Sequence, residues 1–185
     1  MGMATIIRNN TFLQRLIGAA ALDAAIYEEV EADPRATSQA LLVVLGSSVA
    51  AGIGFRPLAE QTIYSVIFFS IVALISWAAW ALLTYEIGTR LMPEAATRSD
   101  VGELLRTIGF AATPGLLRVL GVMPAVLMPV FVGTAVWMLV AMIVAVRQAL
   151  DYRHTGRAIA VCVVGWVLSV AIAVVMGVIF GPSVS

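Results

Sequence analysis

The stretch LLRTIGFAATPGLLRVLG, residues 104–121, decides the fold, because it determines whether the chain crosses a membrane four or five times. It is apolar in character but contains Arg106, Pro114 and Arg118. An arginine at the centre of a bilayer costs about 2.5–3.5 kcal/mol on the insertion scale. If the stretch spans, however, the two arginines fall near opposite ends, where their long side chains reach the lipid headgroups.

The composition of the whole chain indicates an integral membrane protein. Of its 185 residues, 61% are apolar and 12% are charged, and the mean hydropathy is +1.00. Soluble domains are roughly 45–50% apolar and about 25% charged. A small soluble domain could not remove so much apolar surface from water, and disordered segments are poor in apolar residues.

Other uncharged stretches are long enough to cross a hydrocarbon core, which takes roughly 20 residues as a helix. The last of them holds thirteen Val, Ile, Leu and Phe residues. Such residues favour insertion by about 0.3–0.6 kcal/mol each near the centre of the bilayer. The predicted spans besides 104–121 are Ala36–Phe55, Gln61–Tyr85, Val126–Val146 and Ala158–Phe180.

The arginines favour five spans over four. All eleven basic residues are arginine, and cytoplasmic segments of membrane proteins carry the excess of positive charge. Five spans with the N-terminus inside put nine arginines on the cytoplasmic side and leave only Arg56 and Arg118 outside. Four spans give seven against four. We therefore predict an all-α, polytopic membrane bundle of five transmembrane helices, with a cytoplasmic N-terminus and an external C-terminus.

An amphipathic helix is predicted before the first span. Thr11 and Gln14 form a capping-box pattern, which opens a helix over Phe12–Ala32. Its apolar arc predicts that it lies along the cytoplasmic face or packs beneath the bundle. Asp33, before Pro34, caps the start of the next helix. We thus divide the chain into a cytoplasmic segment, residues 1–35, and a transmembrane domain, residues 36–185.

The acidic end of this helix is a candidate functional region. Glu28, Glu29, Glu31 and Asp33 form either a solvated helix end or a surface that attracts a basic partner or a cation. Small residues recur at helical spacing in several spans, including Gly46, Ala50 and Gly54 in the first and Gly165 to Gly181 in the last. This pattern predicts close helix packing within one chain, or a homo-oligomer.

Residues for chemistry are scarce, so no enzyme activity and no cofactor is predicted. The spans contain no motif of an intramembrane protease. The single Cys162 excludes a disulfide framework, and with the single His154 it provides too few ligands for a zinc cluster of Cys and His residues. The formal net charge of zero gives no attraction to nucleic acid. Arg118 is either a structural side chain, a contact for a lipid phosphate or part of a transport path, with Pro114 interrupting the third span.

Short motifs give the chain a resemblance to a known family. The third span carries a Gly-aromatic-x-x-x-Pro pattern that runs from Gly109 to Pro114, and Trp137 follows in the next span. With five closely spaced helices, these features resemble the Yip-domain proteins, which are Ypt-interacting membrane proteins. Arg157-Ala158, which opens the last span, matches the family as well. The stretches Tyr27-Glu28-Glu29-Val30, Asp33-Pro34 and Gln39-Ala40 are similar to the bacterial branch in particular.

The resemblance implies a multi-pass membrane protein with no known catalytic residues. Eukaryotic relatives bind small GTPases, but their Asp-Leu-Tyr-Gly-Pro motif is absent here, so GTPase binding is not carried over. The leading hypothesis is a scaffold or adaptor in the lipid bilayer of the bacterial inner membrane, which binds a cytosolic protein through its N-terminal helix. The alternative is a small transporter or lipid-handling protein that uses the interrupted third span.

Overall fold

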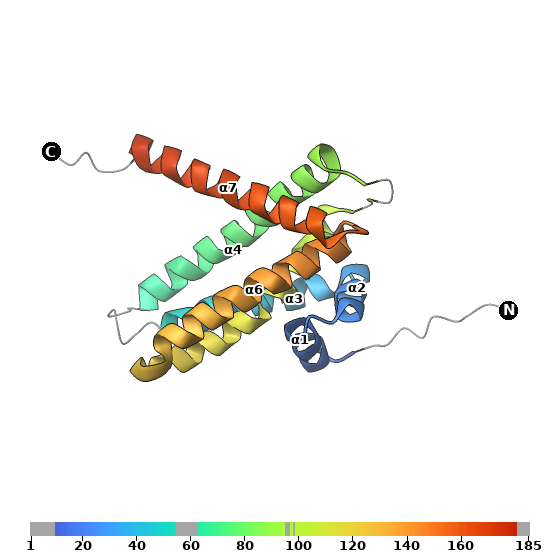
Figure 1. The fold of residues 1–185 in the computed structure, drawn as a ribbon. Coiled ribbons are helices and arrows are strands. Elements are labelled where there is room, and N and C mark those ends of the chain that lie inside the picture. Colours follow the sequence, from blue (N-terminus) through green and yellow to red (C-terminus); the bar gives the residue numbers. More distant parts are fainter. Residues whose placement is uncertain (1–9, 55–62, 95–96, 98, 181–185) are drawn as a thin grey trace.

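The computed structural model describes residues 10–54, 63–94, 97 and 99–180, and the regular structure of these residues is entirely helical (Figure 1). The predicted all-α class is therefore confirmed. The predicted span ends at Phe55 and Gln61, together with Gly181 of the last small-residue pattern, lie outside the described residues.

The helices follow one another with short connections. The α-helices are α1 (Phe12–Ala20), α2 (Ala24–Ala32), α3 (Ala36–Gly54), α4 (Ile63–Glu86), α5 (Val101–Ala111), α6 (Leu127–Ala149) and α7 (Thr155–Phe180). Between them lie a π-helical turn, η1 (Ile87–Leu91), and two 3₁₀ segments, η2 (Thr113–Val122) and η3 (Pro124–Val126).

The N-terminal segment forms two helices, so the prediction of one helix over Phe12–Ala32 was wrong. The capping box at its start is confirmed, since the Gln14 amide donates to Thr11 Oγ1 over 3.3 Å and Gln14 Oε1 accepts from the Thr11 amide. The helix stops at Ala20, and Leu22 adopts a positive φ of 62°. Asp23 then accepts the Ala25 amide at 3.0 Å as the N-cap of α2, and a side chain that caps a new helix competes with continuation of the old one.

Two helices among the described residues are long and apolar enough to cross a membrane. They are Ala36–Gly54 and the helix that runs from Pro124 to Ala149. A shorter apolar helical part covers Thr155–Leu168. These three elements coincide with predicted spans, and α4 occupies the position of a fourth.

The third predicted span is interrupted where Pro114 suggests. Asp100 and Glu103 form a capping box that begins α5, with the Glu103 amide 2.9 Å from Asp100 Oδ1. The α-helix ends at Ala111, and ten residues from Thr113 continue as a 3₁₀ helix. A 3₁₀ helix rises about 2.0 Å per residue, so η2 covers about 20 Å and α5 adds about 16 Å.

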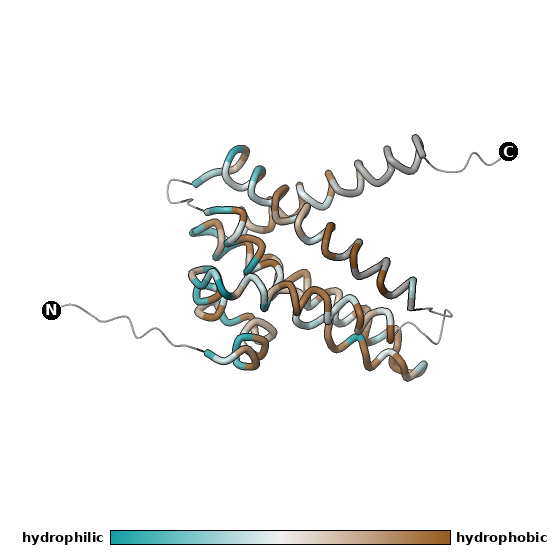
Figure 2. The backbone as a smooth tube through the Cα atoms, turned by 180° about the vertical axis from the view of Figure 1, so that it is seen from behind, coloured by the Kyte–Doolittle hydropathy of each residue, from teal (hydrophilic) through white to brown (hydrophobic). Residues whose placement is uncertain are grey.

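The 3₁₀ segment η2 has two main neighbours and keeps an exposed side. It lies against both α3 and α6, while α4 packs on α3 and α5, and α7 packs on α6. The helices α1 and α2 lie at one end, against α5 and α6 (Figure 1). Figure 2 shows that hydrophilic residues gather at the end that carries α2 and the α6–α7 connection. The bundle therefore has a polar end, which we call the inner end.

Backbones approach closely where α3 meets η2. The predicted third span, which consists of α5 and η2, is called the third crossing segment after that prediction. A Cβ atom on Gly54 would lie 1.9 Å from the carbonyl oxygen of Arg118, and one on Gly115 would lie 2.0 Å from Ser47 Oγ. Ala50 and Gly54 of the predicted small-residue pattern are buried. In lipid, which offers no hydrophobic drive between helices, such contacts supply the packing energy. The prediction of close helix packing within the chain is confirmed at this interface.

Replacement of Gly54 by alanine should destabilise the bundle, because the new methyl group meets backbone that cannot rotate away. We expect Gly54→Ala to lower the free energy of unfolding by about 1–3 kcal/mol, measured by thermal unfolding in detergent micelles. Gly133→Ala on α6 is the matched control, since nothing lies within 4 Å of its Cβ position. Equal midpoints for both variants would contradict the packing role of Gly54.

Candidate functional site

The candidate residues occupy two separate places in the fold. Glu28, Glu29 and Asp33 lie at the inner end, on or just after α2. Gly109, Pro114 and Arg118 follow one another along the third crossing segment, whose 3₁₀ part leads away from that end. The two groups are therefore described in turn.

The acidic residues surround a buried arginine that sequence reasoning missed. The side chain of Arg15 is only 6% exposed. Its Nη2 atom lies 3.0 Å from Glu29 Oε1 and 2.8 Å from Asp33 Oδ2. Its Nη1 atom donates to Gln39 Oε1 over 2.9 Å. This Arg15 cluster joins α1, α2 and the first turn of α3, so Glu29 and Asp33 face inward and are not a solvated end.

Asp33 has two structural tasks. Its Oδ1 atom accepts the Arg35 amide at 3.0 Å, which confirms the predicted capping role at the start of the first span. Its Oδ2 atom binds Arg15. Burial alone would raise the pKa of Asp33, but the hydrogen bonds from Arg15 and the Arg35 amide hold it below its usual value. Burial disfavours the charged form of Arg15, but its hydrogen bonds with Asp33 and Glu29 and their negative charges raise its pKa overall.

A second buried arginine fixes α2 to the third crossing segment. Arg106 Nε donates to the Glu31 carbonyl oxygen over 2.9 Å, and Nη2 donates to the same oxygen. The prediction that Arg106 reaches the lipid headgroups was wrong, because its side chain is buried and binds the Glu31 carbonyl oxygen in the last turn of α2. A free carbonyl at a helix C-terminus is a favourable partner for a cation.

The Glu31 carboxyl group lies in a crowded acidic environment. Burial raises its pKa to about 7, and the negative charges of Glu103, Asp151 and Glu28 add to the increase, whereas Arg106 opposes it. Glu28 itself is exposed and accepts a hydrogen bond from Gln148 Nε2 at 2.9 Å. Of the acidic residues after Asp23 on α2, Glu28 is thus the one presented to the surroundings of the inner end.

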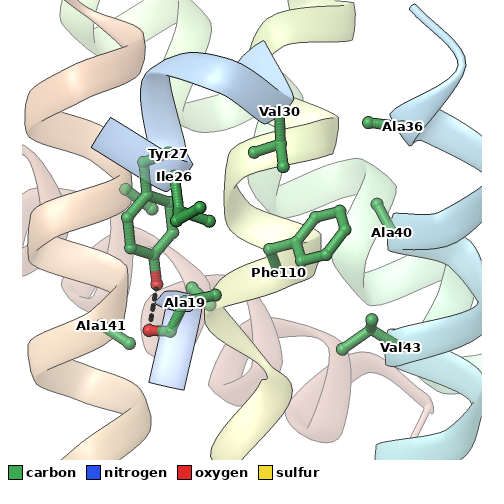
Figure 3. Packing of buried hydrophobic residues seen from close by; sticks show 11 residues of the cluster. Ala19, Ile26, Tyr27, Val30, Ala36, Ala40, Val43, Phe110 and Ala141 are labelled. Atoms are coloured by element: carbon green, nitrogen blue, oxygen red, sulfur yellow. Dashed lines mark hydrogen bonds between the residues drawn. The ribbon is translucent and has the colours of Figure 1, made fainter. Parts of the chain in front are cut away.

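An apolar cluster lies directly behind these charges. Figure 3 shows Val30 of α2 pointing toward Phe110 and Tyr27 of the same helix pointing toward Ala19, with residues of α3 and Ala141 of α6 around them. The Tyr27 hydroxyl group donates to the Ala19 carbonyl oxygen over 3.1 Å, which ties α2 to α1. Gly109 is needed here for space, because a Cβ atom on it would lie 2.6 Å from Ala40 Cβ. Its place in the sequence motif therefore has a packing reason.

Arg118 and Pro114 serve the contact between crossing segments. Pro114 is fully buried, and Thr113 Oγ1 donates to the Phe110 carbonyl oxygen over 2.6 Å at the change from α-helix to 3₁₀ helix. Arg118 Nε donates to Thr134 Oγ1 over 3.2 Å, and its guanidinium carbon lies 5.5 Å from the ring centroid of Phe131. Both partners are near the start of α6, whereas the acidic residues contact its far end through Gln148. The structure thus brings Gly109 to the apolar cluster behind the acidic residues, but it does not bring Pro114 or Arg118 to them.

Of the two buried arginines, only Arg15 left a partial signal in the sequence. Arg15 is the only charged residue of α1, while α2 carries Glu28, Glu29 and Glu31 and no basic residue. Because charges at a membrane boundary need partners, this imbalance indicates pairing between them. The role of Arg106 had no such signal, since its acceptor is a backbone carbonyl oxygen and not a side chain.

Loss of the Arg15 side chain should leave two carboxylates without their partner. We expect Arg15→Leu to lower the free energy of unfolding by about 3 kcal/mol, the low end for a buried pair, because Asp33 keeps 29% of its side chain exposed. Arg90→Leu is the control, since its pair with Glu86 is exposed and such pairs contribute about 0–1 kcal/mol. Thermal unfolding in micelles measures both, and similar small losses would contradict a structural Arg15 cluster.

Stability should also depend on pH through Glu31. Its pKa in the folded chain, about 7, exceeds its ordinary value of 4.5, so the folded state binds the proton more tightly. This contribution is fully present below pH 4.5 and is lost as the pH rises through about 7.

We therefore expect Glu31→Gln to be more stable than the natural chain at pH 8.5, with a higher unfolding temperature and a free energy of unfolding about 1 kcal/mol larger. The effect is small because solvent screens this partly exposed group. At pH 4.5 the two should unfold alike. Glu86→Gln, in an exposed ion pair on α4 that is not among the charges acting on Glu31, should leave the pH dependence as it is. A Glu31→Gln profile parallel to that of the natural chain would show that Glu31 does not titrate in this range.

Comparison with known proteins places the fold in a family. The family model of the Yip1 domain matches residues 23–177. The matched range begins at Asp23, the N-cap of α2, and therefore includes α2 to nearly the end of α7 but not α1. No curated protein sequence matches the chain, and no solved structure does.

Proposed function

Because this chain belongs to the Yip1 domain family, we propose that it is a non-enzymatic membrane protein of five spans that acts as a scaffold or adaptor through its inner end. The observation that carries the proposal is the gathering of polar residues at one end of an otherwise apolar bundle (Figure 2). At that end, the paired side chains of Arg15, Glu29 and Asp33 hold the helices together. Arg153 and His154 are exposed.

Helix lengths support five crossings. A hydrocarbon core of about 30 Å is matched by α3 at about 28 Å, α6 at about 34 Å and the combined α5 and η2 at about 36 Å. The α4 and α7 helices, with 24 and 26 residues, exceed that length. In this arrangement the arginine balance puts the N-terminus in the cytoplasm and the C-terminus outside a bacterial inner membrane.

The inner end is a built platform and not a set of loose loops. Tyr152, in the α6–α7 connection, donates through its hydroxyl group to the carbonyl oxygens of Gly88 and Met92, at 3.1 and 3.0 Å. Arg157 Nε lies 3.2 Å from Glu94 Oε1. These bonds fix the α6–α7 connection to the end of α4 and leave the side chains of Asp151, Arg153 and His154 exposed. A preorganised polar surface suits a cytosolic protein partner.

The polar side chains of the crossing segments support a structural and non-catalytic role. Thr107, Thr113 and Thr134 donate to carbonyl oxygens of their own helical turns. The Arg118 side chain donates a hydrogen bond to Thr134 and makes a cation–π contact with Phe131, and both contacts connect η2 to α6. These contacts add nothing to the alternative of transport or lipid handling, so we propose the adaptor alone, without cofactor or nucleic acid.

Site-specific crosslinking in native membranes tests the adaptor proposal. A photoreactive amino acid at Arg153, on the inner end, should give discrete protein adducts. The same group at Val132, which is 61% exposed on α6, should react with lipid and give no protein adduct of defined mass. Adducts that are absent at Arg153, or equal at both positions, would contradict a partner surface at the inner end.

Reporter fusions test the number of spans. Alkaline phosphatase, which is active only outside the cytoplasm, should be active after Ser185 and inactive when fused after Asp100, at the end of the connection that precedes α5. Green fluorescent protein should show the opposite pattern. A fluorescent fusion after Ser185 would remove the fifth crossing and with it the proposed orientation.

A further inference from the structure

The helix α1 buries its charged residue and exposes its aliphatic residues. Its inward side carries Arg15, which is 5% exposed, together with Ala19 at 0%. Its outward side carries Leu13 and Ile17, which are 63% and 62% exposed. These two residues are four apart and lie one above the other on the same face. A surface helix of a soluble protein presents the opposite arrangement, with the apolar stripe inward and charges outward.

The inverted arrangement is fixed by bonds and is not a loose docking. The Arg15 cluster holds the polar side of α1 against α2 and α3. The ring of Phe12 meets that of Phe110 edge-on, with centroids 6.4 Å apart. Rotation of α1 to hide its aliphatic face would break the ion pairs of Arg15 and expose Ala19. The outward aliphatic face is therefore part of the folded state.

The position of α1 along the bundle shows what surrounds that face. Trp137 Nε1 of α6 donates to the Ala20 carbonyl oxygen, at the C-terminal end of α1, over 2.8 Å. Trp137 precedes Arg147 by almost three helical turns, about 15 Å along the axis of α6. If Arg147 marks the inner boundary of that span, then α1 lies beside the span and not beyond its end (Figure 1).

The neighbouring surface of α6 is apolar and exposed. Val140, one turn further on, is 41% exposed, and Val136 beside Trp137 is 59% exposed. Toward the inner end, by contrast, Ala145 and Ala149 are fully covered by other helices. The outward face of α1 thus continues the apolar surface of α6 at the level where that surface is open.

We propose that α1 is a lipid-facing anchor, in which Leu13 and Ile17 contact the acyl chains of the inner leaflet while Arg15 closes the protein side. The occupant of this face is lipid, because the face is aliphatic, lies at the level of a span and joins the exposed surface of α6. Interfacial helices insert their apolar side about 5–10 Å into the boundary of headgroups and acyl chains. A charge on the opposite side is tolerated because it is paired within the protein.

This anchor also shields the Arg15 cluster. Since α1 covers Arg15 from outside, acyl chains meet Leu13 and Ile17 where they would otherwise meet ion pairs. The inference rests on the proposed membrane placement of α6 but not on the adaptor role. It concerns a helix that lies outside the matched family domain.

Spin labels in the full-length chain test the proposal. Nitroxides are attached to single cysteines at Leu13→Cys, Ile17→Cys, Val132→Cys and Arg153→Cys in a Cys162→Ala background, and each protein is reconstituted into phospholipid vesicles. Molecular oxygen collides with labels in hydrocarbon, and a water-soluble nickel chelate collides with labels in water. We expect positions 13 and 17 to show a severalfold higher oxygen-to-nickel ratio than position 153, and a ratio close to that of position 132.

The controls separate the possible failures. If positions 13 and 17 resemble position 153 while position 132 reports lipid, the anchor is overturned and the placement of α6 stands. If positions 13 and 17 are shielded from both reagents, protein covers this face, in a second copy of the chain for example, and the anchor is again overturned. If position 132 reports water, the membrane placement of α6 fails first. Labels at exposed positions leave the core intact, and thermal unfolding of each variant confirms that it is folded.

Discussion

The approach of two backbones between α3 and the third crossing segment is the constraint on which the other contacts depend. In lipid, where apolar surface gains nothing from leaving its solvent, helices hold together by close packing. Gly54 rests on the Arg118 carbonyl group and Gly115 on Ser47, so η2 has one position on α3. That position sets α5, which places Phe110 beneath α2 and brings Arg106 to the end carbonyl group of α2. The inner end is therefore built on a contact that depends on the absence of a side chain at Gly54 and Gly115.

Charge at the inner end has two uses that the structure separates clearly. Arg15, Glu29 and Asp33 satisfy one another inside the protein and bind α1, α2 and α3 into one unit. Breaking such a pair costs more than the pair itself contributes, because the remaining group stays desolvated. Glu28, Arg153 and His154 remain exposed. An interaction with a cytosolic partner would thus engage the second set and leave the first undisturbed, which lets the platform bind without rearrangement.

Local sequence rules predicted the parts of the fold that depend on neighbours in the chain. The Thr11–Gln14 capping box, the break at Pro114 and the Asp33 cap follow from side chains within a few residues of the backbone that they bind. The division of the N-terminal segment into two helices was missed, because the apolar period continues through Leu22 while Asp23 starts a new helix. The Arg15 cluster and the bond from Arg106 to Glu31 were also missed. They join residues far apart in the chain, and no local pattern states which buried cation meets which acceptor.

The unusual length of η2 has a mechanical consequence. Its ten residues rise about 2.0 Å each, against about 1.5 Å in an α-helix. A change of the whole segment to α-helical geometry would shorten this crossing by about 5 Å, which equals the difference in hydrocarbon thickness between a thin and a thick biological membrane. The length of this one crossing can therefore change, whereas α3 and α6 beside it are already α-helical and keep their length. Bilayer thickness would act on this chain through η2 before it acted on any other crossing.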